Sequence, residues 1–574
     1  MNNKKLWAVT DIESRKWIEF LCIGYYDGNI YEYFLDLTSY FNFLFSPKNK
    51  CSLIYAHFGG IFDFLFLLNY ILHNTNIYKL KSIIPRGSGI LSFKVSVGKR
   101  TITFSDSSAL LPFSLRSLAE NFKVETQKGV INYNRITKVT PKLLSYMEDD
   151  HKALYQIMKR YESWPMVEKV GLKSTIASQA LAIFRDEYEI EDRKLPVISP
   201  DIEIFSRNAY KGGRTEIFRP YFNQKKGQSP LYYYDVNSLY PYVMKKNDYP
   251  TYFDYYTCEL ETGKLGIYHL QIEVPKTLKI PILGIIHEGK YIFPTGKIEG
   301  YWTTPEIKYA MKLGCKILKI NQGIIFKSGD KLFKNYVDKL YKIRENSNKK
   351  SVDNVLAKLL LNSLYGRFGL DREKETVVID DGSEGLIPYI KFEIKKNVFI
   401  RLAKKPIKIK SFNNVAIAAF VTAYARIHMH KIYQKCGNDL YYSDTDSIIT
   451  TKKFPTSSKL GDLKLEKTIK KACFLLPKTY IIENDDFKSV VMKGFDQKKI
   501  QHFGVDDFFS GLEGDLRRLK SNIEEKPARF KSALRKGKLL SMTEKSTKQI
   551  RSQYDKRIFI KSKNSWSSDP IHLT

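Results

Sequence analysis

The most constraining feature of the sequence is a pair of aspartates two residues apart, Asp444 and Asp446, in the segment YYSDTDSIITT. Aromatic and β-branched residues flank the pair, a composition typical of strands. On a strand or at a hairpin tip, residues i and i+2 point to the same face, so the two carboxylates should lie close together. Like charges at this spacing repel each other unless a cation lies between them. An exposed aspartate-rich turn has the same triplet, so the motif needs support from other segments.

Two upstream segments supply that support. The segment LYYYDVNSLYPYVM delivers Asp235 at the end of an apolar, aromatic run, and SLYP then turns the chain away. The segment AKLLLNSLYGRFG places residues at i, i+4, i+7 and i+8, on one face of a helix. Nucleotidyl transfer needs such parts: carboxylates on separate strands to hold two divalent ions, and a cationic helix face to grip a triphosphate. Each segment alone could be core packing. The residues on the helix face are Lys358, Asn362, Tyr365 and Gly366.

These three segments resemble motifs A, B and C of the family B DNA polymerases, in DVNSLYP, KLLLNSLYG and YSDTDS. The likeness is greatest to the protein-primed branch of terminal-protein phages and linear organellar or cytoplasmic plasmids. It implies a DNA-templated DNA polymerase with two Mg²⁺ or Mn²⁺ ions in each active site, bound by Asp235 and Asp446 with Asp444 in support. The nucleotide-binding residues that it implies are Lys358, Arg344 and Asn362, with Tyr365 packing on the nascent base pair and Tyr240 excluding a ribose 2′-hydroxyl. Lys342, Lys349 and Lys350 are close enough in sequence to compete with Arg344 for its role.

Three further segments resemble DNA-contacting elements of the same family. YKGG resembles the element that links the exonuclease and polymerase domains. VTAYARI resembles the template-contacting TxxAR element, and PKTYII carries a KxY motif that would contact the primer end. The DNA-binding residues implied are Tyr210, Gly212, Gly213, Thr422, Arg426, Lys478 and Tyr480.

A second acidic series begins at the N-terminus. VTDIES carries Asp11 and Glu13 on one face of a predicted strand, Asp63 follows in a predicted buried helix, and Tyr146 and Asp150 stand at i and i+4 of another. Four carboxylates and a tyrosine that orients the attacking water would serve two-metal phosphodiester hydrolysis. The order DxE, FD, YxxxD resembles the proofreading 3′–5′ exonuclease of the same family, with the four carboxylates as metal ligands.

One residue departs from the exonuclease pattern. The family usually has an asparagine after the histidine of its second motif, where this chain has Phe58 after His57. That position contacts the single-stranded primer end in the family, so the departure bears on exonuclease efficiency and leaves the expected metal ligands complete.

The motif spacing predicts an α/β multidomain chain: an RNase H-like 3′–5′ exonuclease domain, then a right-hand polymerase of palm, fingers and thumb with two insertions. The insertions resemble the two terminal-protein regions, one docking a protein primer and the other closing a tunnel around DNA. Both could instead be long surface insertions of β character, and the basic C-terminal tail could be a solvated face or partly disordered. The predicted boundaries are 1–170 (exonuclease), 171–246 (linker and palm), 247–331 (first insertion), 332–369 (fingers), 370–414 (second insertion), 415–499 (palm) and 500–574 (thumb).

The composition agrees with a polyanionic partner. The 574 residues include 94 Lys+Arg against 61 Asp+Glu, a formal net charge of +33. This excess suits nucleic acid, although an AT-rich genome also raises the lysine content. The six cysteines show no CxxC spacing, which gives no indication of a zinc site or a disulfide framework. No apolar stretch is as long as a membrane span.

The expected partners are template and primer DNA, dNTPs and a terminal protein that serves as primer, with a monomeric enzyme that does not bind a membrane. Only ten residues precede Asp11, too few for a targeting peptide, so an organellar protein would have to be encoded in the organelle. Otherwise a virus or plasmid would encode it, for action in the host cytoplasm or organelle. The alternatives are a DNA-primed repair polymerase and a non-catalytic DNA-binding remnant. A reverse transcriptase fits poorly, because its site usually reads YxDD.

Overall fold

The computed structural model describes most of the chain, and none of the helices that it describes is long and apolar enough to cross a membrane. The described residues are 6–126, 129, 131, 136–189, 198–328, 331–371, 373–379, 388–395, 398–406, 414–520, 524–527, 529–535, 543–546, 548–550, 553–562 and 565–574.

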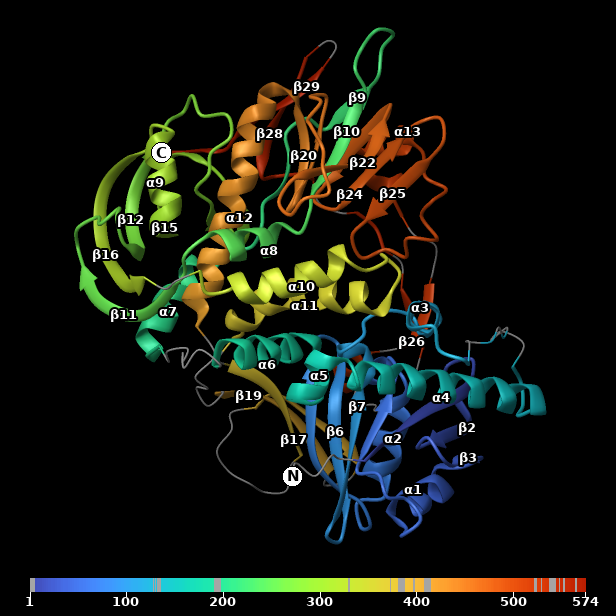
Figure 1. Ribbon diagram of the computed structural model, residues 1–574. Helices are drawn as coiled ribbons and strands as arrows, with labels where there is room; N and C mark the ends of the chain where they lie inside the picture. Colours follow the sequence, from blue (N-terminus) through green and yellow to red (C-terminus); the bar gives the residue numbers. More distant parts are fainter. Residues whose placement is uncertain are drawn as a thin grey trace.

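The N-terminal region, blue in Figure 1, folds around one end of a ten-stranded mixed sheet, where the strand order is β3-β2-β1-β4-β7. β1, β4 and β7 run parallel, whereas β2 and β3 are antiparallel to their neighbours. This is the RNase H-like arrangement that the sequence predicts. Successive residues of β1 face opposite sides: Val9 packs toward α3 and α4, and Ala8 packs toward α1 and α2. The elements are β1 (Trp7–Arg15), β2 (Glu19–Tyr26), β3 (Tyr31–Phe34), α1 (Leu37–Phe45), β4 (Leu53–Ala56), α2 (Asp63–His73), β5 (Lys79–Arg86), β6 (Gly89–Val97), β7 (Arg100–Asp106), α3 (Leu115–Phe122) and α4 (Pro141–Glu162).

The palm contains a five-stranded sheet in the order β22-β10-β21-β20-β8, next to a four-stranded sheet in the order β25-β24-β23-β9. β10 is central in the first sheet and pairs antiparallel with both β21 and β22. Helices α8 and α12 pack against each other. The elements are α7 (Pro200–Ala209), β8 (Thr215–Ile217), β9 (Tyr221–Asn223), β10 (Leu231–Val236), α8 (Leu239–Lys246), α12 (Val415–Cys436), β20 (Leu440–Asp444), β21 (Ser447–Thr450), β22 (Leu463–Ile469), β23 (Lys471–Leu476), β24 (Thr479–Glu483) and β25 (Lys488–Met492).

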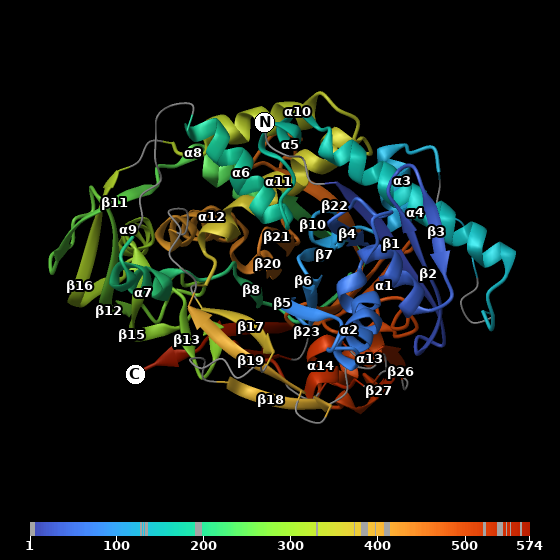
Figure 2. The ribbon, with the colours of Figure 1, turned by 90° about the horizontal axis from the view of Figure 1, so that it is seen from below.

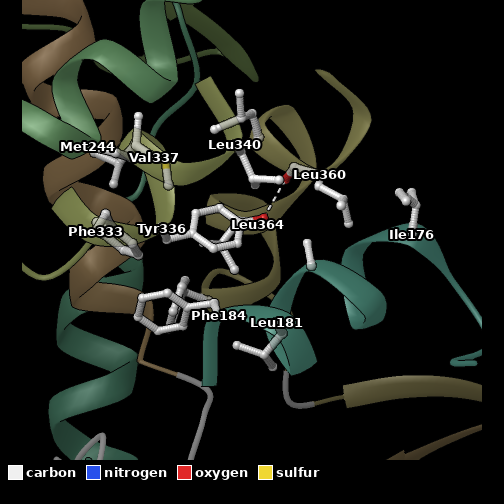
Figure 3. Packing of buried hydrophobic residues seen from close by; sticks show 14 of the residues in the cluster. Ile176, Leu181, Phe184, Met244, Phe333, Tyr336, Val337, Leu340, Leu360 and Leu364 are labelled. Carbon is white, nitrogen blue, oxygen red and sulfur yellow. Dashed lines mark hydrogen bonds between the residues drawn. The ribbon is translucent and has the colours of Figure 1, made fainter. Parts of the chain in front are cut away.

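The predicted fingers are a pair of helices, α10 (Lys334–Glu345) and α11 (Val352–Phe368). Figure 3 shows the buried side chains that join this pair to α6 (Ile176–Glu189) and to Met244 of α8. The hydroxyl of Tyr336 donates to the carbonyl of Leu360 at 3.0 Å, which satisfies a polar group inside this core. In Figure 1, α4, α5 (Pro165–Val170) and α6 run between the exonuclease sheet and the fingers pair.

The first insertion has a core of its own beneath a separate sheet, in the order β11-β16-β12-β15-β30. The predicted strands and helix of this region are present. The last strand, however, comes from the C-terminus, because His572 pairs with Thr295 in parallel. The elements are β11 (Pro250–Thr257), β12 (Leu265–Val274), β13 (Ile285–His287), β14 (Lys290–Ile292), β15 (Thr295–Thr303), α9 (Thr304–Lys312), β16 (Lys316–Ser328) and β30 (His572–Leu573).

The second insertion extends the exonuclease sheet. β17 (Glu373–Ile379) pairs with β5 at Val377 and Ile83, and β18 (Pro388–Lys395) and β19 (Val398–Pro406) continue the sheet outward. Residues 372, 380–387, 396–397 and 407–413 of the expected hairpin region lie outside the described residues. The insertion is therefore attached to the exonuclease domain by backbone pairing.

The C-terminal region, predicted as the thumb, contacts both the exonuclease domain and the palm. Phe530 is buried in the core of the exonuclease domain, and the guanidinium of Arg529 donates to Ser88 Oγ at 2.8 Å. Tyr554 is also internal, since its hydroxyl accepts from the backbone of Ile217 in the palm. Both aromatic side chains therefore contact other parts of the protein. Figure 2 shows α14 beside β18. The elements are α13 (Val505–Leu512), β26 (Glu524–Pro527), α14 (Phe530–Arg535), β27 (Thr543–Ser546), β28 (Arg557–Lys561) and β29 (Trp566–Pro570).

Candidate active sites

The DTD triplet lies at the tip of the β20–β21 hairpin, as the sequence predicts. Asp444 ends β20 and pairs with Ser447, so that Thr445 and Asp446 form the turn. Thr445 has a φ of 61°, a left-handed conformation that costs a β-branched residue energy and that often occurs at functional sites. On the other side of β21, Asp235 of β10 pairs with Ser447, and the amide of Val236 donates to the carbonyl of Asp446 at 2.8 Å. This register brings Asp235 next to Asp446.

The two carboxylates on adjacent strands interact electrostatically. Burial, followed by the charge of Asp446, raises the pKa of Asp235 to about 7. Burial and the charge of Asp444 likewise raise the pKa of Asp446. Ionising both groups is therefore costly for the protein alone, and a cation between them would relieve that cost.

Asp444 has protein partners of its own. Thr215 Oγ1 donates to Asp444 Oδ1 at 2.9 Å, and the Nζ of Lys478 lies 3.5 Å from the same oxygen. Lys478 stands in the β23–β24 turn with a φ of 60°. The lysine of the KxY motif thus lies at the β20–β21 hairpin, called the catalytic hairpin below because it carries the predicted catalytic residues Asp444 and Asp446. Tyr480 is only 9% exposed and packs against Tyr442.

Among the described residues, no group of three or more Asp, Glu, His or Cys side chains is arranged so that it could hold a metal ion. The donor set at the palm nevertheless suits Mg²⁺, which usually binds one or two carboxylates together with substrate phosphates and water. Asp235 and Asp446 provide such a pair of hard oxygen ligands.

Motif B presents a polar face toward the same region. Lys358, Asn362 and Gly366 are exposed along α11, and the charge of Lys358 lowers the pKa of Asp235, which indicates that the two groups are near each other. The rings of Tyr240 and Tyr365 stack with centroids 4.3 Å apart and planes at 17°.

Two other predicted site residues also lie near the catalytic hairpin or motif A. Arg344 donates from Nη1 to Ser238 Oγ at 2.7 Å, so α10 brings this guanidinium to the motif A turn. Gly213 of YKGG lies against the catalytic hairpin, where a Cβ atom would be 2.7 Å from Thr445 Cγ2. Tyr210 contacts Gly369 at the end of α11, and Gly212 is exposed.

The two residues of the TxxAR element that the sequence predicts to contact DNA are both buried. Thr422 is 2% exposed, and its hydroxyl donates to the carbonyl of Ala419. Arg426 is 3% exposed and forms a buried ion pair with Glu306 of α9, with Nη2 and Oε1 2.7 Å apart. Its Nη1 donates to the carbonyls of Lys211 and Gly212. Arg426 therefore holds together the palm, the YKGG segment and the first insertion. No local pattern in the sequence indicates Glu306 as its partner.

The exonuclease carboxylates converge as predicted. Asp11, Glu13, Asp63 and Asp150 all line one cavity of about 570 Å³. Asp63 stands at the start of α2, where the backbone amide of Ile12 donates to its Oδ1 at 2.9 Å. Burial raises the pKa of Asp63 to about 7. Carboxylate oxygens are of the ligand type that Mg²⁺ and Ca²⁺ prefer.

Tyr146 does not line this cavity. Its ring is buried in a small cluster with Leu143 and Met147, one turn of α4 before Asp150. Its expected contact with the attacking water stays a prediction.

The sequence prediction missed two residues of the exonuclease site, Asp106 and Trp17. Asp106, at the end of β7, accepts from the amides of Phe58 and Gly60 at 3.0 and 3.3 Å and so fixes the loop after His57. Trp17 and Phe58, which are 46% and 37% exposed, line the cavity as aromatic surfaces. An Asp-Ser-Ser turn after a buried strand was a signal for Asp106. No pattern linked Trp17 to this site.

Comparisons with known proteins agree with this geometry. The family model "DNA polymerase type B, organellar and viral" matches residues 45–140 and 137–436. A probable DNA polymerase of Podospora anserina is 31% identical over 70% of this chain, and one of Neurospora intermedia is 32% identical over 64%. The chain spans 39% and 40% of the length of these two relatives.

A phage relative matches over a larger share of its length. The DNA polymerase of Bacillus phage phi29 is 28% identical over 445 residues, 70% of each chain. The structure of phi29 DNA polymerase with primer-template DNA and incoming nucleotide matches with a TM-score of 0.75 at 23% identity, over 96% of this chain and 100% of that one. The fold is therefore that of an exonuclease domain joined to a palm, fingers and thumb. By its sequence, this chain belongs to the type B DNA polymerases of organelles and viruses.

Proposed function

We propose that this chain adds deoxynucleotides to a 3′-hydroxyl under the direction of a DNA template. The observation that carries the proposal is the register that sets Asp235 beside Asp446, where the charge of Asp446 opposes ionisation of Asp235. Such a pair is of little use to stability and suits cation-dependent phosphoryl transfer.

The other site residues divide the work of binding. Lys358 and Arg344 would hold the triphosphate, Asn362 would contact the nucleotide from the same helix face, and Tyr365 would pack on the nascent base pair. Tyr240 would lie under the sugar and exclude a 2′-hydroxyl. Asp235 and Asp446 would hold divalent cations, Mg²⁺ or Mn²⁺, which when bound supply Lewis-acid stabilisation of the reacting phosphate.

Substitution of either carboxylate tests the polymerase. Asp235→Asn or Asp446→Asn should reduce dNTP incorporation roughly a thousandfold, about 4 kcal/mol, because each removes a ligand charge at the reacting phosphate. Binding of primer-template should survive. The control is Asp486→Asn, at an exposed position between β24 and β25. Extension by either site variant within tenfold of wild type would contradict the assignment and favour a non-catalytic DNA-binding role.

We also propose a 3′–5′ exonuclease in the N-terminal domain. Four carboxylates that line one cavity support it. Trp17 and Phe58 offer stacking surfaces for an unpaired 3′ end, in place of the asparagine of the family pattern.

The exonuclease test separates the two sites. Asp11→Ala with Glu13→Ala should abolish release of 3′ mononucleotides and leave polymerisation nearly intact, since the palm carboxylates belong to another sheet. Unchanged 3′ degradation by this double variant would refute the site.

We infer protein priming and strand displacement from the two insertions. The first folds as an independent sheet that would dock a terminal protein, and the second extends the exonuclease sheet, a position suited to closing a tunnel around DNA. The enzyme would act as a monomer on a linear DNA of a virus, plasmid or organelle.

Deletion of residues 378–408 tests the tunnel. The variant should still add single nucleotides to a primed template, but it should make shorter products per binding event and fail to displace a strand from nicked duplex. Deletion of the exposed Lys225–Gly227 turn is the control. Undiminished strand displacement would instead indicate a conventional DNA-primed polymerase.

A further inference from the structure

A basic pocket of about 270 Å³ lies between three helices, outside both acidic sites. α8 and α12 belong to the palm, and α9 belongs to the first insertion. Each helix contributes residues spaced three or four apart, so one face of each turns toward the pocket. The lining residues are Tyr242, Val243, Lys246 and Asn247 from the α8 region, Pro305, Lys308, Tyr309 and Lys312 from α9, and Tyr424, Ile427, His428 and Lys431 from α12.

The four lysines of this pocket are exposed and have no ion-pair partner among the described residues. No carboxylate is among the lining residues. Tertiary structure has thus gathered four positive charges from three helices, an arrangement that raises the free energy of the protein unless an anion binds there.

The field inside the pocket is positive. The pKa of His428 falls to about 4, mainly through burial, with the charges of Lys246 and Lys431 lowering it further. The charge of Asp462 raises this pKa, but by less than the charge of either lysine lowers it. The imidazole is therefore neutral near pH 7, and the lysines carry the positive charge.

Aromatic rings alternate with these cations. The rings of Tyr242 and His428 lie 4.8 Å apart, and Lys431 Nζ lies 5.9 Å from the centre of the Tyr309 ring. Lys246 Nζ donates to the hydroxyl of Tyr242 at 2.8 Å. Ammonium groups that reach phosphates, interleaved with rings that pack on sugars or bases, are typical of surfaces that bind single-stranded nucleic acid. The small volume suits one nucleotide unit and excludes a duplex.

The pocket is separate from the polymerase site. Tyr240 and Tyr242 are two residues apart on α8, about 200° around the helix axis. Tyr240 stacks on Tyr365 at the polymerase site, whereas Tyr242 lines the pocket. A ligand held here would lie on the side of α8 that faces away from the catalytic carboxylates.

We propose that this pocket binds a backbone phosphate of a single-stranded nucleic acid outside the catalytic centre. Because its lysines come from both the palm and the first insertion, an occupied pocket would also hold α9 against α8 and α12. The proposal shares with the proposed function only the premise that the chain binds nucleic acid.

The test is the salt dependence of binding to an oligothymidylate strand. Lys308→Gln with Lys312→Gln should lower the slope of log K against log salt by about 0.7, which is the contribution of one neutralised phosphate of a single strand. Lys431→Gln, from another helix, should lower the slope in the same direction by no more than about 0.7. The control is Lys316→Gln with Lys319→Gln, which removes the same charge from exposed positions of β16 in the same insertion.

The outcomes separate the pocket from the catalytic assignment. A slope for the Lys308/Lys312 variant equal to that of the control would refute phosphate binding by the pocket, even if wild type binds the strand and extends primers. Wild type that fails to bind the oligonucleotide would overturn both proposals. If calorimetry shows that inorganic pyrophosphate binding is lost in the variant while the strand slope is unchanged, the site takes free phosphates and the strand assignment is wrong. If the variant loses binding of a polyglutamate peptide while its strand slope is unchanged, the ligand of the pocket is an acidic protein segment and the strand assignment is wrong.

Discussion

Replacement of Arg426 tests the buried ion pair that joins α12 of the palm to α9 of the first insertion. The Arg426 and Glu306 side chains are each 1% exposed, and Glu306 Oε1 accepts from both Nε and Nη2 of Arg426, at 3.0 and 2.7 Å. Replacing Arg426 by methionine would leave a carboxylate buried without its partner. Removing one member of a buried pair typically costs about 3–5 kcal/mol. Loss of the bonds to the carbonyls of Lys211 and Gly212 adds about 1 kcal/mol or more.

The expected result is therefore that Arg426→Met lowers the local opening free energy of α9 and α12 by about 4 kcal/mol. Hydrogen exchange measures this quantity segment by segment, which suits a multidomain chain that need not unfold in one step. Arg426→Met combined with Glu306→Gln removes both charges and should recover about 2 kcal/mol relative to the sum of the single variants. Lys435→Met, at an exposed position of the same helix, should leave the exchange unchanged.

The reasoning fails if Arg426→Met leaves the protection of both helices within about 1 kcal/mol of wild type, below the cost of a broken buried pair. If the slope of log K against log salt for primer-template binding then falls by about 0.9, the side chain is a phosphate contact on duplex DNA after all.

Three further predictions address sugar selection, the exonuclease site and acid stability. Tyr240→Val should raise ribonucleotide incorporation by orders of magnitude with modest loss of dNTP use in single-nucleotide assays, and equal discrimination in variant and wild type would exclude this role. Trp17→Ala should weaken binding of an unpaired 3′ end by about 1–3 kcal/mol in fluorescence titrations, whereas Ile18→Ala, at the adjacent exposed position, should not; equal loss in both would refute stacking. Burial lowers the pKa of His430 to about 3, so the unfolded chain gains a proton at this imidazole near its ordinary pKa of about 6.5 while the folded chain does not. The free energy of unfolding should therefore fall as the pH is lowered from about 6.5 toward 3, by at most about 4 kcal/mol from this group. In urea titrations, His430→Gln should flatten that decline, whereas His502→Gln, at an exposed position, should not. An unchanged decline in His430→Gln would refute the role of this imidazole.

Local spacing in the sequence was enough to predict several features of the two candidate sites. The DTD triplet at a hairpin tip, the polar face of α11 and the pair Asp63 at the start of α2 with Asp150 inside α4 follow from periodicities of 2 and 3.6 residues. The order of these motifs along the chain was enough to predict an exonuclease domain followed by a polymerase.

Only the tertiary structure decided which distant residues meet. The burial of Arg426 depends on Glu306, 120 residues away, and the sheet of the first insertion takes its last strand from His572 at the other end of the chain. The four lysines of the basic pocket come from three helices, and each one alone reads as an ordinary exposed charge. A local pattern specifies which face of an element a side chain occupies, whereas its burial, its partners and its charge environment are set by the element that packs against that face.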